Sequence, residues 1–344
     1  MSRDQMAKMR IAGGQFQSLD QETSTFLKQL GITSIQFNTP LLPGDEVWSY
    51  EDLRALHSQC IQEGFILEAI ENVPIQFYDK IMLGLPGRDQ QIENYQTIIK
   101  HMGRIGIPIL GHHFMPNFVW RTTMNAPGRG GAEVSAFDER LIATQENAVI
   151  YPAIGEAPDL TEERLWSYYQ YFLDAVLPVA EQSGVRLALH PDDPPMKQVN
   201  GMPRLFYSPE QFKKAMAIAN SDAWCLNLCL GCCSEMPHGT EVFEMIDFFG
   251  PIGKIGYVHF RDVQGVVPHF QECFLGEGNF KPAQVMRKLK EVGFRGFILD
   301  DHVPRIINDT SWRHRGRAHE MGYLKGVLEA VEDLDSMPST RVHH

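Results

Sequence analysis

The sequence lacks the features of a membrane, secreted or nucleic-acid-binding protein. No run approaches the roughly 20 apolar residues that a membrane-spanning helix needs. Residues 1–14 contain no apolar stretch long enough for a secretory signal, which favours a cytoplasmic protein. Basic residues are outnumbered, with 31 Lys and Arg against 43 Asp and Glu. The formal net charge of −12 argues against a nucleic-acid partner, because phosphate contacts need a basic surface.

Cysteine is scarce, and its distribution does not indicate disulfides. Four of the six cysteines lie within nine residues, in the pattern C-x3-C-x2-C-C that begins at Cys225 and ends at Cys233. Disulfides are the less expected reading of a chain without a secretory signal. The pattern superficially suggests zinc or an iron–sulfur cluster, but no second pair follows at zinc-ribbon spacing. We therefore expect neither.

Short apolar runs alternate eight times with longer helical patterns. The runs span 9–15, 33–38, 65–71, 108–114, 186–191, 223–231, 255–263 and 296–302. The helical patterns cover 20–30, 50–63, 89–105, 160–183, 208–220, 241–249, 281–292 and 315–331. Eight βα units predict an α/β fold of the (β/α)8 TIM-barrel type. An open doubly wound sheet is the alternative, but neither a G-x-G-x-x-G fingerprint nor a P-loop supports it.

The longest connection, about 116–159, follows the fourth strand. Its length suggests a lid or a binding element, because long loops in compact domains are usually functional. It would lie on the face where barrel enzymes carry out chemistry. No run resembles an interdomain linker, so we expect one domain over residues 1–344.

Four residues of metal-binding type end four consecutive apolar runs. They are His190, Cys229, His259 and Asp301, each 30 to 42 residues from the next. The carboxyl ends of parallel barrel strands meet at one mouth, so these side chains should converge. One histidine alone would more simply be structural, but four ligand types on adjacent strands predict a metal. The set suits Mn²⁺, Fe²⁺, Co²⁺, Ni²⁺ or Zn²⁺, whereas Mg²⁺ and Ca²⁺ prefer oxygen.

Further polar residues cluster at the same strand ends. Glu71 and His113 end the third and fourth runs and are candidate substrate contacts. His302 directly follows Asp301, which suits a general acid or base at neutral pH. The alternative role for His302 is to hold its loop by hydrogen bonding.

Two arginines and a tryptophan are further candidates for substrate binding. Arg261 lies two residues after His259, on the same side of the strand, and could hold a carboxylate in a bidentate fork. It could equally pair with a neighbouring protein carboxylate. Arg121 is a second candidate anion contact. Trp120 could form a wall of the pocket, with core packing as the alternative.

These residues and their context resemble the mannonate dehydratase family, whose barrels belong with the xylose-isomerase-like enzymes. The resemblance covers most of the chain and rests on EVW (46–48), IENVP (70–74), KIMLG (80–84), RDQQIENY (88–95), HFMPNFVWRTT (113–123), LHPDDPP (189–195), LCLG (228–231), HFRDV (259–263), DDH (300–302) and GRAHEMGYLKG (316–326). It implies a lyase that converts D-mannonate to 2-keto-3-deoxy-D-gluconate in hexuronate catabolism, with Mn²⁺ or Fe²⁺. The family's metal ligands carry over to His190, Cys229, His259 and Asp301, and its catalytic histidine to His302.

The sequence also departs from the family pattern. The family's R-P-D-H-G-R motif corresponds to residues 299–304 here, so that Leu299 and Pro304 replace its arginines. The position of the family's catalytic tyrosine falls on Trp312, whose indole cannot shuttle a proton. A family histidine falls on Gln76. A metal-bound water or another histidine, His314 or His113, would then have to protonate the leaving hydroxyl.

Three functions are therefore compared. The first is a metal-dependent dehydratase of a small sugar acid. The second is an isomerase or epimerase of a related sugar or sugar acid, which would use the same metal and base but keep the hydroxyl. The third is a metal-binding barrel that acts as a sensor without catalysis. The sequence does not fix the oligomeric state and is compatible with a homo-oligomer.

Overall fold

The computed structural model describes residues 8–142 and 159–336, and within them eight parallel strands close into a barrel. Neighbouring strands around the barrel follow the order β1, β14, β11, β10, β7, β4, β3 and β2. Their bounds are β1 Arg10–Gly13, β2 Ser34–Asn38, β3 Ile66–Glu71, β4 Ile109–His112, β7 Arg186–Leu189, β10 Trp224–Cys229, β11 Ile255–His259 and β14 Phe297–Leu299. Each lies within a predicted apolar run, so the predicted (β/α)8 barrel is confirmed.

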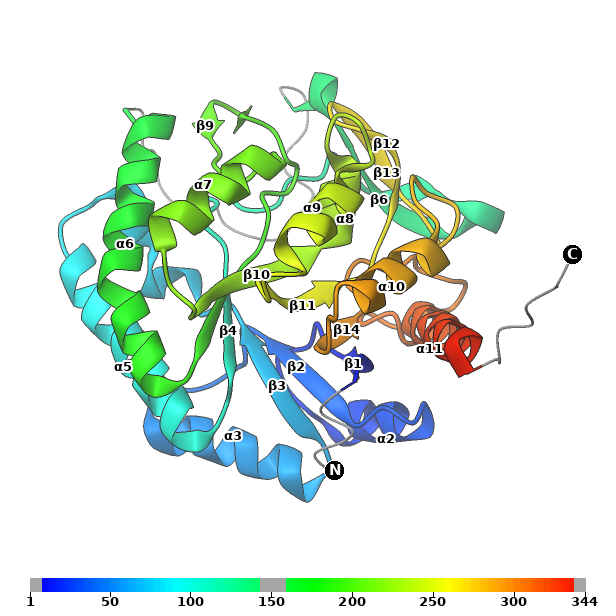
Figure 1. Ribbon diagram of the computed structural model, residues 1–344, viewed down its shortest axis with the longest axis horizontal. Helices are drawn as coiled ribbons and strands as arrows, with labels where there is room; N and C mark the ends of the chain where they lie inside the picture. The colour runs from blue at the N-terminus through cyan, green and yellow to red at the C-terminus, as the bar shows by residue number, and fades with distance from the viewer. Residues whose placement is uncertain (1–7, 143–158, 337–344) are drawn as a thin grey trace, which may run out of the picture.

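Helices surround the strands (Figure 1). They are α2 Gln21–Gln29, α3 Tyr50–Gln62, α4 Asp79–Leu83, α5 Arg88–Ile105, α6 Glu162–Ser183, α7 Pro209–Ala219, α8 Leu230–Glu235, α9 Glu241–Phe249, α10 Pro282–Glu291 and α11 His314–Ser336. Eight of them match the predicted helical patterns. The short helices α4 and α8 were not predicted, and α8 begins directly after Cys229, where the apolar run continues.

Local hydrogen bonds explain where several helices begin and end. Ser49 Oγ accepts from the backbone N–H of Asp52 at 3.1 Å, which satisfies one of the free donors at the start of α3. Thr161 Oγ1 does the same for Arg164 at the start of α6, at 3.2 Å. Helix α6 ends at Ser183, and the following Gly184 has a φ of 65°, a left-handed conformation that glycine adopts at little cost.

Two apolar layers hold the barrel together. The larger layer lies between the strands and the surrounding helices. The smaller one contains Ala12, Ala69, Ala188, Cys225, Tyr257, Phe297 and Leu299, all fully buried or nearly so. Within it, the rings of Tyr257 and Phe297 stack with centroids 4.8 Å apart. The small alanines leave room for these rings, so the barrel interior is packed rather than open. All six cysteines are free and buried.

An antiparallel sheet adjoins the barrel. It contains β5 Thr123–Pro127, β6 Glu133–Asp138, β12 Val263–Val266 and β13 His269–Glu272, in the order β12, β13, β6, β5. Thus the connection predicted as a long loop contains two strands and the short 3-10 helices Arg129–Gly131 and Glu139–Leu141. Residues 143–158 of that connection lie outside the described residues. A further 3-10 turn, Ile75–Phe77, and the hairpin β8 Gln198–Val199 with β9 Met202–Pro203 complete the fold.

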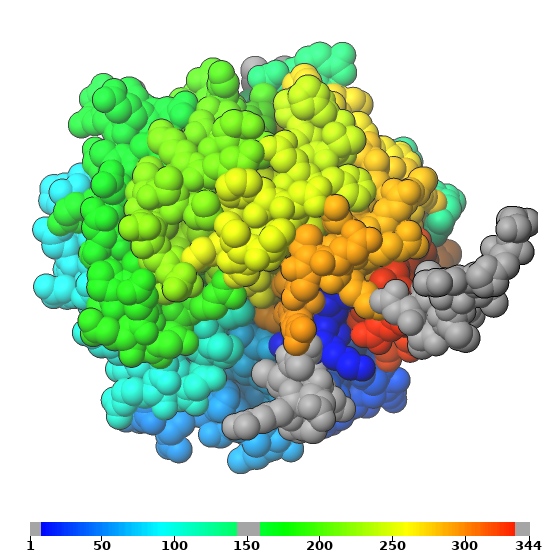
Figure 2. Space-filling view, viewed as in Figure 1, coloured from blue at the N-terminus to red at the C-terminus, as the bar shows by residue number. Residues whose placement is uncertain are grey.

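The helices cover the outside of the barrel. In the space-filling view, green to orange residues of the elements from α6 to α10 make up most of the visible face (Figure 2). Among the described residues, no helix is long and apolar enough to cross a membrane.

Candidate metal and substrate site

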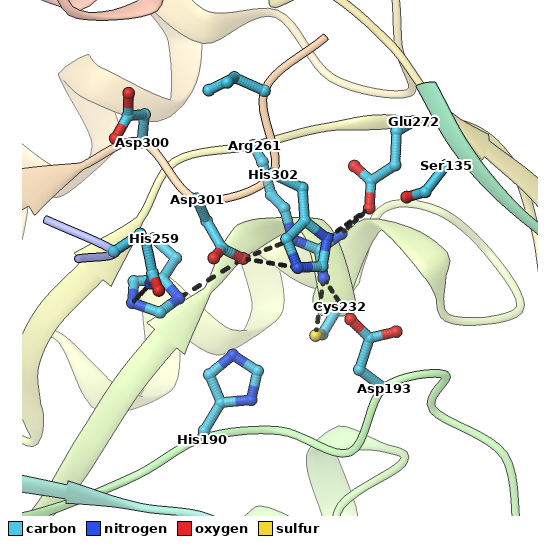
Figure 3. A network of polar contacts seen from close by, with 12 residues as sticks. Ser135, His190, Asp193, Cys232, His259, Arg261, Glu272, Asp300, Asp301 and His302 are labelled. Atoms are coloured by element: carbon cyan, nitrogen blue, oxygen red, sulfur yellow. Dashed lines mark hydrogen bonds and ion pairs between the residues drawn. The ribbon is translucent and has the colours of Figure 1, made fainter. Parts of the chain in front are cut away.

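The four predicted ligands converge at the carboxyl ends of their strands. One ligand atom from each of His190, Cys229, His259 and Asp301 lies within 4.8 Å of the other three, and all four residues are buried. Cys229 and His259 are the last residues of β10 and β11, while His190 and Asp301 lie one and two residues beyond β7 and β14. Figure 3 shows the two imidazole rings and the carboxylate directed toward one another.

Hydrogen bonds hold both imidazoles in a defined orientation. His190 Nδ1 lies 2.7 Å from the carbonyl oxygen of Pro191, so it donates its proton there and leaves Nε2 as a lone-pair donor. His259 Nε2 lies 3.1 Å from the Glu71 carboxylate. The other ring nitrogen of His259, Nδ1, is buried without any hydrogen-bond partner. Metal-binding histidines usually donate a hydrogen bond from the ring nitrogen that does not bind the metal. A divalent cation would satisfy the unpartnered Nδ1 of His259.

The electrostatics of the four residues also fit a cation. Burial raises the pKa of the Cys229 thiol, but the hydrogen bond from Cys232 and nearby positive charge lower it well below its usual value. Burial lowers the pKa of His259, but the Glu71 and Asp301 carboxylates raise it well above its usual value. The surroundings thus favour the thiolate form of Cys229 and positive charge at the centre of the site. The donor set of two imidazoles, one thiolate and one carboxylate suits a divalent transition metal.

Glu71 connects several strands at the mouth of the barrel. Besides His259, its carboxylate accepts hydrogen bonds from Asn227 at 3.2 Å, from Gln15 at 3.2 Å and from Gln36. Every one of these partners is on or beside a different strand. The predicted substrate contact Glu71 therefore lines the cavity but already has its oxygens engaged by the protein.

Two buried arginines form a second layer beside the metal ligands. Arg261 donates from Nε to Asp301 at 2.9 Å and from Nη2 to Asp193 at 2.7 Å (Figure 3). It also donates from Nη1 to Glu235 at 2.6 Å. Arg121 donates to Asp193 and, at 2.9 Å, to Glu272. The arginines thus hold the ligand Asp301 and the acidic residues around it in fixed positions.

This layer explains a second group of metal-ligand types. Asp193, Cys232 and Glu235 also have atoms within 4.8 Å of one another. However, the Arg261 guanidinium contacts all three, and its Nη2 lies 3.2 Å from Cys232 Sγ. Since a guanidinium already supplies the positive charge there, the group does not form a second metal site.

The charges of the buried carboxylates balance those of the arginines. Burial raises the pKa of Asp193, but Arg121 and Arg261 hold it well below its usual value. Burial likewise opposes ionisation of Glu272, but Arg261 lowers the pKa of that carboxyl. Burial and the Asp193 charge raise the pKa of Glu235 well above its usual value. The two arginines thus face two carboxylates of lowered pKa, Asp193 and Glu272, and one of raised pKa, Glu235.

His302 lies between this layer and open space. Its Nδ1 is 2.9 Å from Glu272 Oε1 and 3.3 Å from Arg121 Nη2. We assign the proton to Nδ1, because the contact with Glu272 is shorter and that carboxylate is ionised. Nε2 then carries a lone pair, 3.8 Å from the Asp301 carboxylate. The side chain is 33% exposed, so the free nitrogen can be reached from the cavity.

A cavity of about 570 Å³ opens over the ligands. Its walls come from the ends of several barrel strands and from the antiparallel sheet, which contributes Met124 and Ser135. Trp312 and Gln76, the predicted departures from the family pattern, both line it. Trp312 donates from Nε1 to the carbonyl oxygen of Gln15 at 3.0 Å. Arg121, Arg313 and Arg317 also line the cavity.

His113 lines the cavity but has both ring nitrogens engaged. Nδ1 accepts from the backbone N–H of Met115 at 3.3 Å, and Nε2 lies 2.9 Å from the Tyr78 hydroxyl. Burial lowers the pKa of His113 to about 3, so its imidazole is neutral near pH 7. A neutral, hydrogen-bonded ring is poorly suited to protonating a leaving group.

The structure does not bring three of the predicted site residues to the cavity. Arg261 is buried among carboxylates, which is the alternative that its sequence position left open. Trp120 packs in an apolar cluster under the antiparallel sheet and donates to the carbonyl oxygen of Asn117. His314 begins α11, lies 2.6 Å from the Thr310 hydroxyl and packs edge-on against Phe26.

Sequence reasoning missed Glu235, Glu272 and Arg313. The two glutamates come from α8 and β13, which have no fixed spacing to the metal ligands. A signal for Arg313 was present, because it directly follows the departure at Trp312.

Comparisons with known proteins agree with this geometry. A family model described as D-mannonate dehydratase (UxuA) matches residues 9–337. A mannonate dehydratase from Geobacillus thermodenitrificans is 31% identical over 326 residues, which cover 85% of this chain and 86% of that protein. A mannonate dehydratase from Thermotoga maritima is 28% identical over 344 residues, which cover 88% and 91% of the two chains.

Solved structures show the same relationship. The crystal structure of mannonate dehydratase from Streptococcus suis serotype 2 is similar with a TM-score of 0.86 and 28% identity, over 97% of this chain and 99% of that chain. A structure of L-ribulose 3-epimerase is similar with a TM-score of 0.62 and 18% identity, over 98% and 100% of the two chains. At that lower identity, the second likeness shows the barrel fold alone.

Proposed function

The chain belongs to the D-mannonate dehydratase family, and we propose that it removes water from D-mannonate to give 2-keto-3-deoxy-D-gluconate. One observation carries the proposal. The four metal-ligand types meet within 4.8 Å, and the free nitrogen of His302 faces the cavity beside them. Dehydration of a sugar acid needs a cation near the carboxylate and a base for the proton on the carbon next to it. The four ligand residues would hold the cation, and His302 would be the base.

His190, Cys229, His259 and Asp301 would hold the metal ion. We propose Mn²⁺ or Fe²⁺, because two imidazoles and a carboxylate suit these ions and oxygen-selective Mg²⁺ and Ca²⁺ do not favour a thiolate. When bound, such an ion supplies a Lewis acid that stabilises the negative charge developing next to the substrate carboxylate.

His302 takes the proton from the carbon next to the carboxylate in this proposal. Glu272 accepts a hydrogen bond from Nδ1–H, which leaves the Nε2 lone pair free and stabilises the imidazolium that forms. The ion pairs of Glu272 with Arg261, at 3.0 Å, and with Arg121 hold that carboxylate in place. The buried arginines thus position the base through Glu272.

The leaving hydroxyl must also be protonated. Trp312 cannot do this, and His113 is neutral with both nitrogens engaged. His302 is then the cavity-lining side chain that can deliver the proton it has just received, among the residues that the structure describes. Both steps would occur on the face of the substrate that His302 approaches.

The antiparallel sheet supports a role as a lid. Arg121 precedes β5, and Met124 and Ser135 of that sheet line the cavity. We propose that this segment excludes water from the bound sugar acid. Free, buried cysteines and the substrate class support a place in hexuronate breakdown in the cytoplasm.

A reaction of the metal-loaded protein with D-mannonate tests the function. Metal-free protein is reconstituted separately with Mn²⁺, Fe²⁺, Co²⁺ and Ni²⁺, and 2-keto-3-deoxy acid is assayed. We expect product with Mn²⁺ or Fe²⁺ and none after chelation. If no ion supports product formation, the proposed function is wrong.

Epimerisation is the second candidate, and Trp312 is the observation that favours it. An epimerase also needs a base and a metal but does not have to protonate a leaving hydroxyl. Replacement of the family's tyrosine by Trp312 would then not impair the reaction. The fate of the substrate hydroxyl separates the two reactions.

A further inference from the structure

Arg313 is a cation at the cavity wall without a carboxylate partner in the described parts of the chain. Its Nη1 donates to the carbonyl oxygen of Val303, and among residues 8–142 and 159–336 no carboxylate lies within 4 Å of it. The other two arginines of the cavity wall are paired: Arg317 with Asp300 at 2.7 Å, and Arg121 with Asp193 and Glu272. Arg313 is therefore the lining arginine best able to accept an anion from outside the protein.

The backbone at Arg313 is also unusual. Its φ is 63°, in the left-handed region that costs conformational energy for a residue with a long side chain. The backbone N–H of Arg313 donates to the carbonyl oxygen of Thr310 at 3.0 Å, and its carbonyl accepts from Arg317 at 2.8 Å. These bonds at the start of α11 hold the strained residue, so that its side chain turns to the cavity and Val303.

The surroundings of Arg313 disfavour the positive charge of its own side chain. Partial burial lowers the pKa of Arg313, and the Arg317 and Arg305 guanidinium groups also lower it, whereas the more distant Glu272 and Asp309 carboxylates raise it. Placing a cation there is costly unless an anion joins it. Strain together with an unmatched charge at one residue is typical of a functional position.

The departures from the family motif at residues 299–304 suggest a role for the Arg313 guanidinium. Leu299 and Pro304 stand where the family has arginines, and Leu299 is buried in the apolar interior of the barrel. Pro304 also cannot bind an anion through its side chain. The Arg313 side chain contacts Val303, between His302 and Pro304. It therefore places a guanidinium near the segment where Leu299 and Pro304 replace the two arginines of the family motif.

We propose that Arg313 binds the carboxylate of the sugar-acid substrate and thereby selects acids over uncharged sugars. The inference rests on the proposed function for the identity of the acid. Arg313 would bind and orient the substrate, whereas His302 moves the proton. An arginine at this place would favour an anionic ligand in a protein whose net charge is −12.

Binding measurements test the inference without turnover. The metal-loaded His302→Gln protein is titrated calorimetrically with D-mannonate and with D-mannonamide, its uncharged analogue. The same titrations are made with Arg313→Asn added, because asparagine tolerates a positive φ. Arg313→Lys keeps the charge, and Arg305→Gln is the matched control, because Arg305 is 43% exposed and does not line the cavity.

We expect Arg313→Asn to weaken mannonate binding by roughly 10- to 100-fold, as loss of a charged hydrogen bond does, and to leave the amide nearly unchanged. Arg313→Lys should restore part of the affinity, and Arg305→Gln should change neither ligand. Thermal unfolding should show Arg313→Asn to be at least as stable as the parent. Arg313→Gly, which adopts the backbone freely, serves as an independent uncharged variant if asparagine disrupts folding.

Two results would overturn the inference. One is an unchanged preference for the acid over the amide in the uncharged variants. The other is a parent protein that binds acid and amide alike. Failure of the proposed function is distinguishable, because the wild-type protein would then bind mannonate through Arg313 without releasing a 2-keto-3-deoxy acid.

Discussion

The position of one proton on the His302 ring decides the proposed chemistry. Glu272 Oε1 accepts a hydrogen bond from Nδ1–H, with 2.9 Å between the oxygen and the nitrogen, so Nε2 is the nitrogen that can act as a base. Of the other cavity residues with ionisable rings or carboxylates, His113 and Glu71 are hydrogen-bonded within the protein, and Asp193 pairs with the arginines. The remaining two, His190 and Asp301, belong to the proposed metal ligands. The account therefore depends on a single imidazole.

Replacing His302 with glutamine should lower kcat by roughly 100- to 10,000-fold, the usual contribution of a general acid or base. Metal content and the affinity for D-mannonate should change little, because His302 is not among the four ligands. Steady-state kinetics and metal analysis measure both quantities.

His314→Gln is the matched control for that variant. His314 lies outside the cavity, bonded to Thr310, so kcat should remain near the wild-type value. If His314→Gln loses as much activity as His302→Gln, the assignment of the base is wrong.

Trp312→Phe tests whether the indole takes part in proton transfer. Trp312 bonds to the Gln15 carbonyl and forms a cavity wall, so its loss should alter KM more than kcat. We expect kcat to fall less than about tenfold, well below the roughly 100-fold or greater loss of a general acid. A larger loss in kcat at unchanged KM would contradict the single-imidazole account.

His112 predicts a pH effect on stability. Burial lowers the pKa of His112 to about 3, and its Nδ1 has no hydrogen-bond partner. Below the unfolded value of about 6.5, the unfolded chain binds a proton that the folded chain does not. This histidine therefore destabilises the fold as pH falls from about 6.5 toward 3.

The variant His112→Leu removes that titration. At pH 5 the variant should gain about 2 kcal/mol relative to the wild-type protein, compared with their difference at pH 7. Urea unfolding at both pH values measures the gain. Parallel stability curves for the two proteins between pH 7 and 5 would show that His112 is not the group responsible.

At the scale of elements, strands β3 and β11 meet through the Glu71–His259 contact. The carboxylate holds Nε2 and so directs the unpartnered Nδ1 toward the other ligands. Glu71→Gln should weaken metal binding by roughly 10- to 100-fold, as loss of such a partner typically does. Competition with a chelator of known affinity measures the change.

Glu68→Gln is the control from the same strand. Glu68 is also buried on β3, but it pairs with Arg10 at 2.5 Å, away from the metal ligands. It should lower the free energy of unfolding and leave metal affinity intact. Equal losses of metal affinity in both variants would mean that Glu71 acts through general stability rather than through His259.

The barrel strands were predictable because parallel strands buried on both faces are continuous apolar runs. The metal ligands were predictable for a related reason, since a polar residue at the end of such a run needs an explanation. The ion-pair layer was not, because Glu235 and Glu272 come from α8 and β13, whose distance to Arg261 is set by the folded barrel.

The antiparallel sheet shows the same limit. Its strands pair segments more than 100 residues apart, as in His269 with Asp138. Short strands of mixed polarity give no clear period of two, so β5 and β6 were predicted only as a long connection. Their placement at the cavity became evident from the fold (Figure 1).

At the scale of the whole molecule, a chain of net charge −12 places several arginines at one mouth of its barrel. Two arginines are paired with buried carboxylates, four residues of metal-ligand type meet beside them, and Arg313 lines the cavity. Together they make a local site for an anionic sugar in an acidic protein.

The most direct test of the central claim follows the reaction by NMR in heavy water. Metal-loaded wild-type protein is incubated with D-mannonate, beside the His302→Gln variant. We predict that the substrate loses its C3 hydroxyl and that the 2-keto-3-deoxy acid carries deuterium at C3. Only the wild-type protein should form this product. Deuterium at C2 with the hydroxyl retained, or equal product from the variant, would contradict the account.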